Sequence, residues 1–499
     1  MKKIFFLLTT ALSMSSIMIN SSKTALADEV NNTGDIVQVA RDFGYQVNEI
    51  NRPKSSIVID AENGQVLWQD NPDIPRNPAS ISKLMTIYLV FEALHNGQIS
   101  MDTIVTATPT DQAIGKLHAI SNNNIVAGVG YPVRELITMT LVPSSNIATV
   151  MLANLVSNND AGGFVTKMNS KAQEIGMTNS YFNNASGAEA VAFSGMYLPQ
   201  GYDQYAGNVT TSRDLSILAF NMLKNYPEIL DFTKNPQVTA MKGTPYEEHF
   251  ETYNYSTPGV KEDVQGSVYG YPGVDGLKTG SSPGGAFNYV ATCLKNNMRV
   301  IEVIMGVGDW SDQDGEYYRH PFGNALLDKT YQDYSYQTIL PAGEHDIDGK
   351  KVKIDSDLMG VVKKNSTPEF KYEDDELILS NTLPLVNDKM IPVETKYTEV
   401  KENKKVKEEK KTLKTTTSSS KSEDQSDDNS HEDFFKKLQS KLIEIPNQIL
   451  YSLIGIVSGT ILFLISRIFK NKKFISWFTA LTGIAAIAVG IINLFYPLI

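Results

Sequence analysis

The chain has 499 residues, 41% of them hydrophobic and 20% charged, which suits an enzyme of two or three globular domains. A formal net charge of -11, with no arginine-rich face, argues against nucleic acid as a partner. The single cysteine, Cys293, excludes an intramolecular disulfide and lies in an apolar run that predicts a buried strand. The six histidines form no H-E-x-x-H pattern and no C-x-x-C pair is present, so we expect no zinc peptidase, no metal and no cofactor.

The N-terminal segment has the pattern of a secretory signal. Lys2 and Lys3 precede an apolar run that continues to Ile19, and an A-x-A pattern follows at residues 25–27. We therefore predict a cleaved signal peptide over residues 1–27. The alternative is an uncleaved anchor, and in either case the body of the protein is exported.

Residues 28–325 alternate between strand and helix patterns and predict an α+β domain. Two short apolar runs flank Asn63-Gly64, which is typical of a β-hairpin. Helical periodicity follows, and apolar strands return late in the domain. We expect an antiparallel sheet built from both ends of the domain, with a helical cluster inserted between them. The ranges are 56–60 and 65–68 for the hairpin, 81–94, 133–141 and 147–156 for helices, and 288–294 and 299–306 for late strands.

Residues 326–399 predict a small all-β domain. Short β-like runs at 336–340, 351–354 and 376–379 are separated by turn residues. This segment contains no cluster of side chains that could perform chemistry.

The C-terminal part of the sequence predicts a tether and a membrane anchor. Residues 400–433 are rich in lysine, then serine and threonine, then acids, which indicates a flexible charged tether rather than the alternative, a charged surface helix. Residues 434–499 predict an amphipathic lead-in and an anchor, with one apolar span at about 445–466 and a possible second at about 474–496. A basic cluster, Arg467 to Lys473, lies between the spans and belongs on the cytoplasmic side, so the catalytic domain is expected outside the cell membrane.

The first motif that carries chemistry is Ser80-Ile-Ser-Lys83. Pro78 cannot lie inside a helix, so a helix is expected to begin near Ser80, with Lys83 one turn further on the same face. A serine hydroxyl needs a base, and a lysine can serve if burial, a helix N-terminus or a second cation lowers its pKa. The same pattern at residues 418–421 lies in the tether and is taken as chance.

The second motif is Ser144-Ser-Asn146, between two apolar helical runs. A hydroxyl here could relay a proton and an amide could hold a peptide group. Residues 121–123 and 157–159 also fit S-x-N, but Pro143 favours a fixed loop at Ser144.

The third motif is Lys278-Thr-Gly280, which occurs once in the chain. A lysine and a threonine at a strand edge can bind a terminal carboxylate. We expect the glycine to let the substrate backbone approach closely.

The three motifs in this order are the set of class A β-lactamases and penicillin-binding proteins. Over about residues 50–310 the chain resembles the low-molecular-mass penicillin-binding proteins of Gram-positive bacteria, which are serine D-alanyl-D-alanine carboxypeptidases with a β-lactamase/transpeptidase-like fold. The anchored arrangement is similar to the staphylococcal-type member, which also cross-links peptides. The stretches that carry the resemblance beyond the motifs are 77–86, 168–187 and 211–215.

The resemblance implies partners and roles. The partners are a peptidoglycan pentapeptide ending in D-Ala-D-Ala, β-lactam antibiotics, and the membrane through the C-terminal segment. The implied roles are nucleophile for Ser80, base for Lys83, proton relay for Ser144, amide binding for Asn146, carboxylate binding for Lys278 and Thr279, and an oxyanion hole from the N–H groups of Ser80 and Ser281.

Two rival functions are a β-lactamase and a non-catalytic wall-binding or penicillin-sensing protein. Class A β-lactamases deacylate with a glutamate about 35 residues past S-x-N, and residues 179–185 here contain none. A non-catalytic protein would have no need of the serine, both lysines and the asparagine together. The sequence leaves open whether water or an amine accepts the acyl group.

Overall fold

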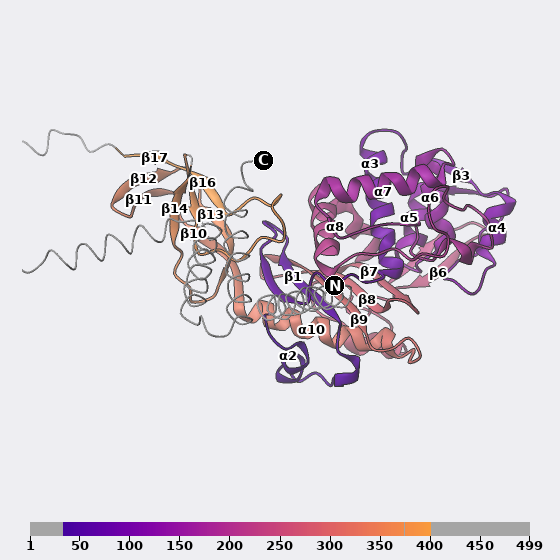
Figure 1. The fold of residues 1–499 in the computed structure, drawn as a ribbon, viewed down its shortest axis with the longest axis horizontal. Coiled ribbons are helices and arrows are strands. Elements are labelled where there is room, and N and C mark those ends of the chain that lie inside the picture. Colours follow the sequence, from indigo (N-terminus) through magenta and orange to yellow (C-terminus); the bar gives the residue numbers. More distant parts are fainter. Residues whose placement is uncertain (1–32, 374, 401–499) are drawn as a thin grey trace, which may run out of the picture. The chain divides into compact units, whose positions relative to one another are not determined.

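The computed structural model describes residues 33–373 and 375–400 (Figure 1). The expected signal peptide, membrane spans and nearly all of the expected tether lie outside these residues. Within the described part, no helix is both long and apolar enough to cross a bilayer.

A five-stranded antiparallel sheet forms the centre of the expected α+β domain, in the order β2-β1-β9-β8-β7. The expected hairpin is confirmed as the first two strands, and the sheet does combine both chain ends of the domain. The strands are β1 (Ser55–Asp60), β2 (Val66–Asp70), β7 (Val274–Ser282), β8 (Ala286–Lys295) and β9 (Met298–Val307).

Both faces of the sheet are covered, because alternate residues of its strands enter two different cores (Figure 1). Ile57 and Ile59 of β1 pack into the core shared with the helical cluster. Val58, between them, packs into the core formed with α2 (Ile36–Asp42) and α10 (Gly315–Asp333). Cys293 lies in this second core and is fully buried, as its apolar run predicted.

The helical cluster is inserted between β2 and β7 in the sequence and surrounds α3 (Lys83–His95), which is buried along most of its length. The helix predicted at 133–141 has these same bounds in the structure. The other members are α4 (Pro109–Gly115), α5 (Val133–Leu141), α6 (Asn146–Ser157), α7 (Ala161–Ile175), α8 (Ser212–Asn225) and α9 (Leu230–Thr233), with the short hairpins β3 (Ile104–Thr106)–β4 (Gly130–Pro132) and β5 (Gln237–Ala240)–β6 (Glu248–Glu251). The fold is therefore α+β, as expected.

The segment after α10 forms small antiparallel sheets around a core of its own. The three β-like runs singled out in the sequence all lie in strands. The strands are β10 (Tyr334–Leu340), β11 (Gly343–Ile347), β12 (Lys350–Ile354), β13 (Leu358–Lys363), β14 (Phe370–Glu373), β15 (Glu376–Leu379), β16 (Glu394–Lys396) and β17 (Thr398–Glu399).

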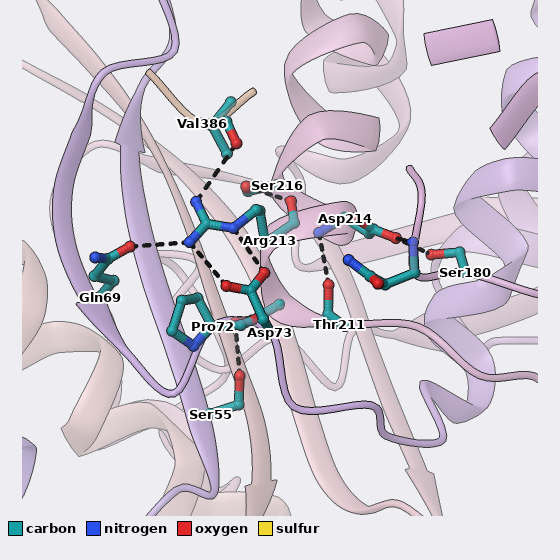
Figure 2. Close-up of polar contacts among 12 residues, drawn as sticks. Ser55, Gln69, Pro72, Asp73, Ser180, Thr211, Arg213, Asp214, Ser216 and Val386 are labelled. Carbon is teal, nitrogen blue, oxygen red and sulfur yellow. Dashed lines mark hydrogen bonds and ion pairs between the residues drawn. The ribbon is translucent and has the colours of Figure 1, made fainter. Parts of the chain in front are cut away.

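The first turn of α8 joins several distant segments (Figure 2). Arg213 forms an ion pair with Asp73 at 2.7 Å and also donates to the side chain of Gln69 and the carbonyl of Val386. The adjacent Asp214 is buried and accepts hydrogen bonds from the backbone of Asn179 and the hydroxyl of Ser180. This turn therefore fixes the loop that begins at Asn179 and leads toward Lys83.

Candidate active site

The nucleophile candidate lies in a tight turn rather than in the first turn of an α-helix. Residues Ala79–Ser82 form a 3₁₀ helix (η2), and α3 begins at Lys83, three residues later than expected. Asn77 caps the turn by accepting the N–H of Ala79 at 2.8 Å, and Ala79 itself has a φ of +50°. Gly187 packs against this turn so closely that a Cβ there would lie 1.9 Å from the carbonyl oxygen of Ala79.

Lys83 is fully buried, and its amine contacts three oxygen atoms. Nζ lies 2.9 Å from Ser80 Oγ, 2.8 Å from Asn146 Oδ1 and 2.8 Å from the carbonyl oxygen of Ser186. The last two atoms can only accept, so they use both N–H groups of a neutral amine and leave its lone pair for the hydroxyl of Ser80. Burial, and then the charge of Lys278, hold the pKa of Lys83 well below its ordinary value. The geometry is that of a serine with its base.

Asn146 begins α6 and connects two of the candidate motifs. Its Oδ1 accepts from Lys83, while its Nδ2 donates to the carbonyl of Ser121 at 2.8 Å and keeps a second hydrogen for another acceptor. The 121–123 stretch, an alternative S-x-N match, thus serves to hold Asn146.

Ser144 lies in the loop just before α6, with a φ of +65°. Its hydroxyl is buried and has no hydrogen-bond partner among the described residues. It is therefore not joined to Lys83 or Ser80 by a direct hydrogen bond, and its role as a proton relay stays a prediction.

Lys278, Thr279, Gly280 and Ser281 follow one another on β7, with the first three buried. The structure shows a tight backbone contact at Gly280. A Cβ at this position would lie 2.4 Å from the carbonyl oxygen of Pro78 and 3.0 Å from the backbone nitrogen of Ser80. The glycine therefore admits the backbone of the turn that carries Ser80, and this contact places β7 beside Ser80. Close approach of a substrate backbone at Gly280 stays a prediction.

Sequence patterns did not identify Arg319, which lies on α10 and is fully buried. It donates to Ser281 Oγ at 3.1 Å and forms an ion pair with Glu316. Burial and then the charge of Arg319 lower the pKa of Lys278 to about 7, while Glu316 acts in the opposite direction. Arg319 lies 38 residues after Ser281 in the sequence, so no local sequence motif connects the two residues.

Among the residues that the structure describes, no three His, Cys, Asp or Glu side chains are grouped so as to hold a metal ion. The chemistry available is that of a serine nucleophile with a buried amine base, facing a second lysine at a strand edge. This set of groups is suited to acyl transfer through a serine ester.

Comparison with known proteins identifies the family. Residues 44–309 match the D-alanyl-D-alanine carboxypeptidase family (peptidase S11), and this chain belongs to it. Residues 336–398 match a domain of unknown function. The chain is 28% identical over 296 residues to the D-alanyl-D-alanine carboxypeptidase DacF of Bacillus subtilis, covering 59% of this chain and 66% of that protein. It is 26% identical over 267 residues to DacA of Escherichia coli strain K12, covering 53% of this chain and 58% of that protein. The chain thus spans less than two thirds of the length of these relatives.

Solved structures support the fold. A peptidoglycan synthesis regulatory factor (PBP3) from Streptococcus pneumoniae aligns with a TM-score of 0.59 and 24% identity, over 70% of this chain and 99% of that one. Penicillin binding protein 6B from Escherichia coli aligns with a TM-score of 0.51 and 24% identity, over 72% of this chain and 97% of that one. The expected resemblance to low-molecular-mass penicillin-binding proteins is confirmed.

Proposed function

We propose that this protein is a serine-type D-Ala-D-Ala carboxypeptidase that acts on peptidoglycan stem peptides and is acylated by β-lactams. The observation that carries the proposal is the buried Lys83 amine, 2.9 Å from Ser80 Oγ, with its two other contacts made to acceptor oxygens. Membership of the carboxypeptidase family supports the same reaction.

The proposed acylation step begins with attack of Ser80 Oγ on the carbonyl carbon of the penultimate D-alanine. The hydroxyl proton passes to Lys83 Nζ, and the N–H groups of Ser80 and Ser281 stabilise the oxyanion. The C–N bond then breaks, the terminal D-alanine nitrogen takes up the proton through Lys83 and Ser144, and an acyl ester remains on Ser80. Asn146 binds the substrate amide, and Lys278 and Thr279 bind its terminal carboxylate. The role of Lys278 is supported by its burial beside a fully buried arginine.

Deacylation requires an acceptor for the acyl group. Water gives a shortened peptide and a free serine hydroxyl, whereas an amine gives a cross-linked peptide. We propose hydrolysis as the basic reaction and transfer as a second outcome at the same ester. Incubation with a pentapeptide, with and without an acceptor muropeptide, separates them by product mass.

Covalent labelling tests the proposed function directly. A fluorescent penicillin should form an adduct with the full-length protein, and the labelled peptide should contain Ser80. Ser80→Ala should abolish both the adduct and release of D-alanine while leaving the circular dichroism spectrum unchanged. Ser144→Ala serves as a comparison, because it removes a relay but keeps the nucleophile. A label on Ser144, or on a residue outside residues 77–86, would refute the assignment.

We further propose that the protein is exported by residues 1–27 and held at the outer face of the cell membrane by residues 445–466, with or without a second span at 474–496. The apolar composition of these segments and the basic cluster between the spans support this orientation. A chain ending at residue 400 should be released from the membrane fraction and retain penicillin labelling, because every described site residue lies before that point. Membrane retention of this shortened chain would contradict the proposed anchor.

A further inference from the structure

The face of the sheet opposite the helical cluster buries a carboxyl group without a hydrogen-bond partner. Glu302, on β9, is fully buried, and neither of its carboxyl oxygens has a partner in the described chain. It lies directly between Val58 of β1 and Ala291 of β8, so its side chain points into the apolar core beneath α10. A buried carboxyl in such surroundings is unfavourable unless it stays protonated and donates a hydrogen bond.

A neighbouring polar group is the hydroxyl of Tyr289, which is also buried without a well-formed hydrogen bond. Gly323 on α10 makes room for both side chains. A Cβ there would lie 2.8 Å from Glu302 Oε1 and 2.8 Å from Tyr289 Cε1. Glu302 and Tyr289 therefore share one space, where a protonated carboxyl can donate to the phenol oxygen.

Tyr289 also touches a histidine. The ring of His320 meets that of Tyr289 edge-on, with centroids 5.1 Å apart. His320 Nδ1 lies 3.1 Å from Ser256 Oγ, and that hydroxyl donates to Asn324 Oδ1 at 2.9 Å. The remaining lone pair of Ser256 is available to the hydroxyl of Tyr289, whose pKa responds to both Ser256 and Glu302.

The second nitrogen of His320 faces Arg319. Arginine can only donate, so the contact of 3.4 Å from Arg319 Nε to His320 Nε2 requires that Nε2 accepts and Nδ1 carries the proton. His320 is thus neutral, and burial and the charge of Arg319 hold its pKa well below the usual value. Arg319 in turn donates to Ser281 Oγ and to the carbonyl of Asn288, both at 3.1 Å.

We infer that Glu302 and His320 are positioning residues for acyl transfer: with Tyr289 and Ser256 they form a buried polar chain that holds Arg319 against Ser281, beside the nucleophile. The inference rests on the proposed function. The contact from Arg319 to His320 fits a neutral imidazole, and burial of the Glu302 carboxyl without a hydrogen-bond partner fits a protonated group. A negative charge on Glu302 would favour a proton on His320, whose Nε2 could then no longer accept from Arg319.

Other titratable groups near Glu302 keep their charge state over the relevant pH range. Burial raises the pKa of Tyr45 beside α2, of Tyr331 on α10 and of Tyr289, and it raises that of Cys293 on β8 to about 12. The pKa of Glu302 is raised by burial to about 8. Loss of its proton is thus the first change of charge in this core as the pH rises above neutral.

The test is the rate of acylation by a fluorescent penicillin and by a carboxylate-free thioester, measured on the full-length protein between about pH 6 and 10. Glu302→Gln keeps the size of the side chain and a donor but cannot ionise. It should retain the neutral-pH rate within about twofold and keep that rate to higher pH than the parent protein. Glu369→Gln, on an exposed surface, is the matched control.

His320→Phe should lower the first-order acylation constant by about tenfold while leaving the dissociation constant of the non-covalent complex nearly unchanged, because positioning acts on the chemical step. Infrared spectroscopy of the unaltered protein provides a second readout that needs no variant to fold. We expect a protonated-carboxyl stretching band that disappears as the pH passes about 8. The inference fails if Glu302→Gln and the parent have the same alkaline profile, or if no such band titrates. Absence of any adduct on Ser80 in the parent would instead refute the proposed function.

Discussion

The charge of Lys278 lowers the pKa of Lys83, whose amine lies 2.9 Å from Ser80 Oγ. The two lysines have opposite tasks in the proposed reaction, because a base must be neutral and a carboxylate-binding group must be charged. Burial is the larger cause of both pKa shifts, and the second cation adds to it at Lys83. Lys278 carries most of its charge only below its pKa of about 7, unless a substrate carboxylate keeps it protonated.

Lys278→Gln should therefore move the ascending limb of the acylation profile to higher pH. A neutral glutamine at position 278 no longer disfavours the charged form of Lys83. The pKa of Lys83 therefore rises, and its neutral form is populated only at higher pH. Acylation by a carboxylate-free thioester reports this shift without the loss of carboxylate binding. Lys224→Gln, a surface lysine on α8, controls for net charge. A limb that stays in place or moves to lower pH would weaken the assignment of Lys83 as the base.

Gly280→Ala should reduce acylation by about 100-fold, because displacement of a catalytic group by about 1 Å has an effect of that size. The new Cβ would lie 2.4 Å from the carbonyl of Pro78, so β7 and the nucleophile turn must separate. Gly270→Ala is a suitable control, since its Cβ would have only ordinary contacts, the nearest at 3.6 Å. Penicillin labelling rates of the two variants, at equal thermal stability, check this expectation.

Local sequence patterns were sufficient to predict the elements whose structure depends on burial and turn residues alone. The helix at residues 133–141, the hairpin around Asn63-Gly64 and the buried strand of Cys293 follow from periodicity and turn chemistry. The three motifs also placed Ser80, Lys83 and Asn146 in one site, because spacing along a helix start brings the first two together and the third begins the neighbouring helix.

The features that the sequence did not predict depend on contacts between segments that lie far apart in the chain. The 3₁₀ turn at Ser80 depends on Gly187 and on Gly280, which approach its backbone from distant segments. The carbonyl of Ser186 and the guanidinium of Arg319 become part of the site only through folding, and neither belongs to a periodic pattern. The contact between Gly280 and the turn that carries Ser80 also could not be predicted from the sequence, because it joins two distant segments.

Asp214→Ala should destabilise the protein by about 2 to 4 kcal/mol, because the part-buried N–H of Asn179 and the buried hydroxyl of Ser180 lose this acceptor. Arg213→Met, one residue earlier on the same turn, should cost about 1 kcal/mol or less, since its partner Asp73 is 45% exposed. Urea unfolding of the two variants compares a buried acceptor with a half-exposed ion pair (Figure 2). Equal losses would show that the buried contacts of Asp214 are not the stronger ones.

Glu302→Gln should change how stability depends on pH. Burial raises the pKa of Glu302 in the folded protein to about 8, from an ordinary value of 4.5. Below about pH 4.5 the carboxyl is protonated in both states and contributes no difference. As the pH rises, the unfolded chain releases this proton while the folded protein retains it, so stability falls until about pH 8 and then levels off.

The full difference of 3.5 pH units corresponds to at most about 5 kcal/mol at 1.36 kcal/mol per unit. Other buried carboxyls, Asp60 and Asp214 among them, have raised pKa values and give slopes of the same sign, so the informative quantity is the difference between parent and variant. Glu302→Gln should be closest to the parent in stability near pH 5 and should become relatively more stable toward pH 8, as measured by urea unfolding at each pH. If the difference in stability between parent and variant is constant from pH 5 to pH 8, Glu302 is already ionised at pH 5. The assignment of a neutral carboxyl beside Tyr289 would then be wrong.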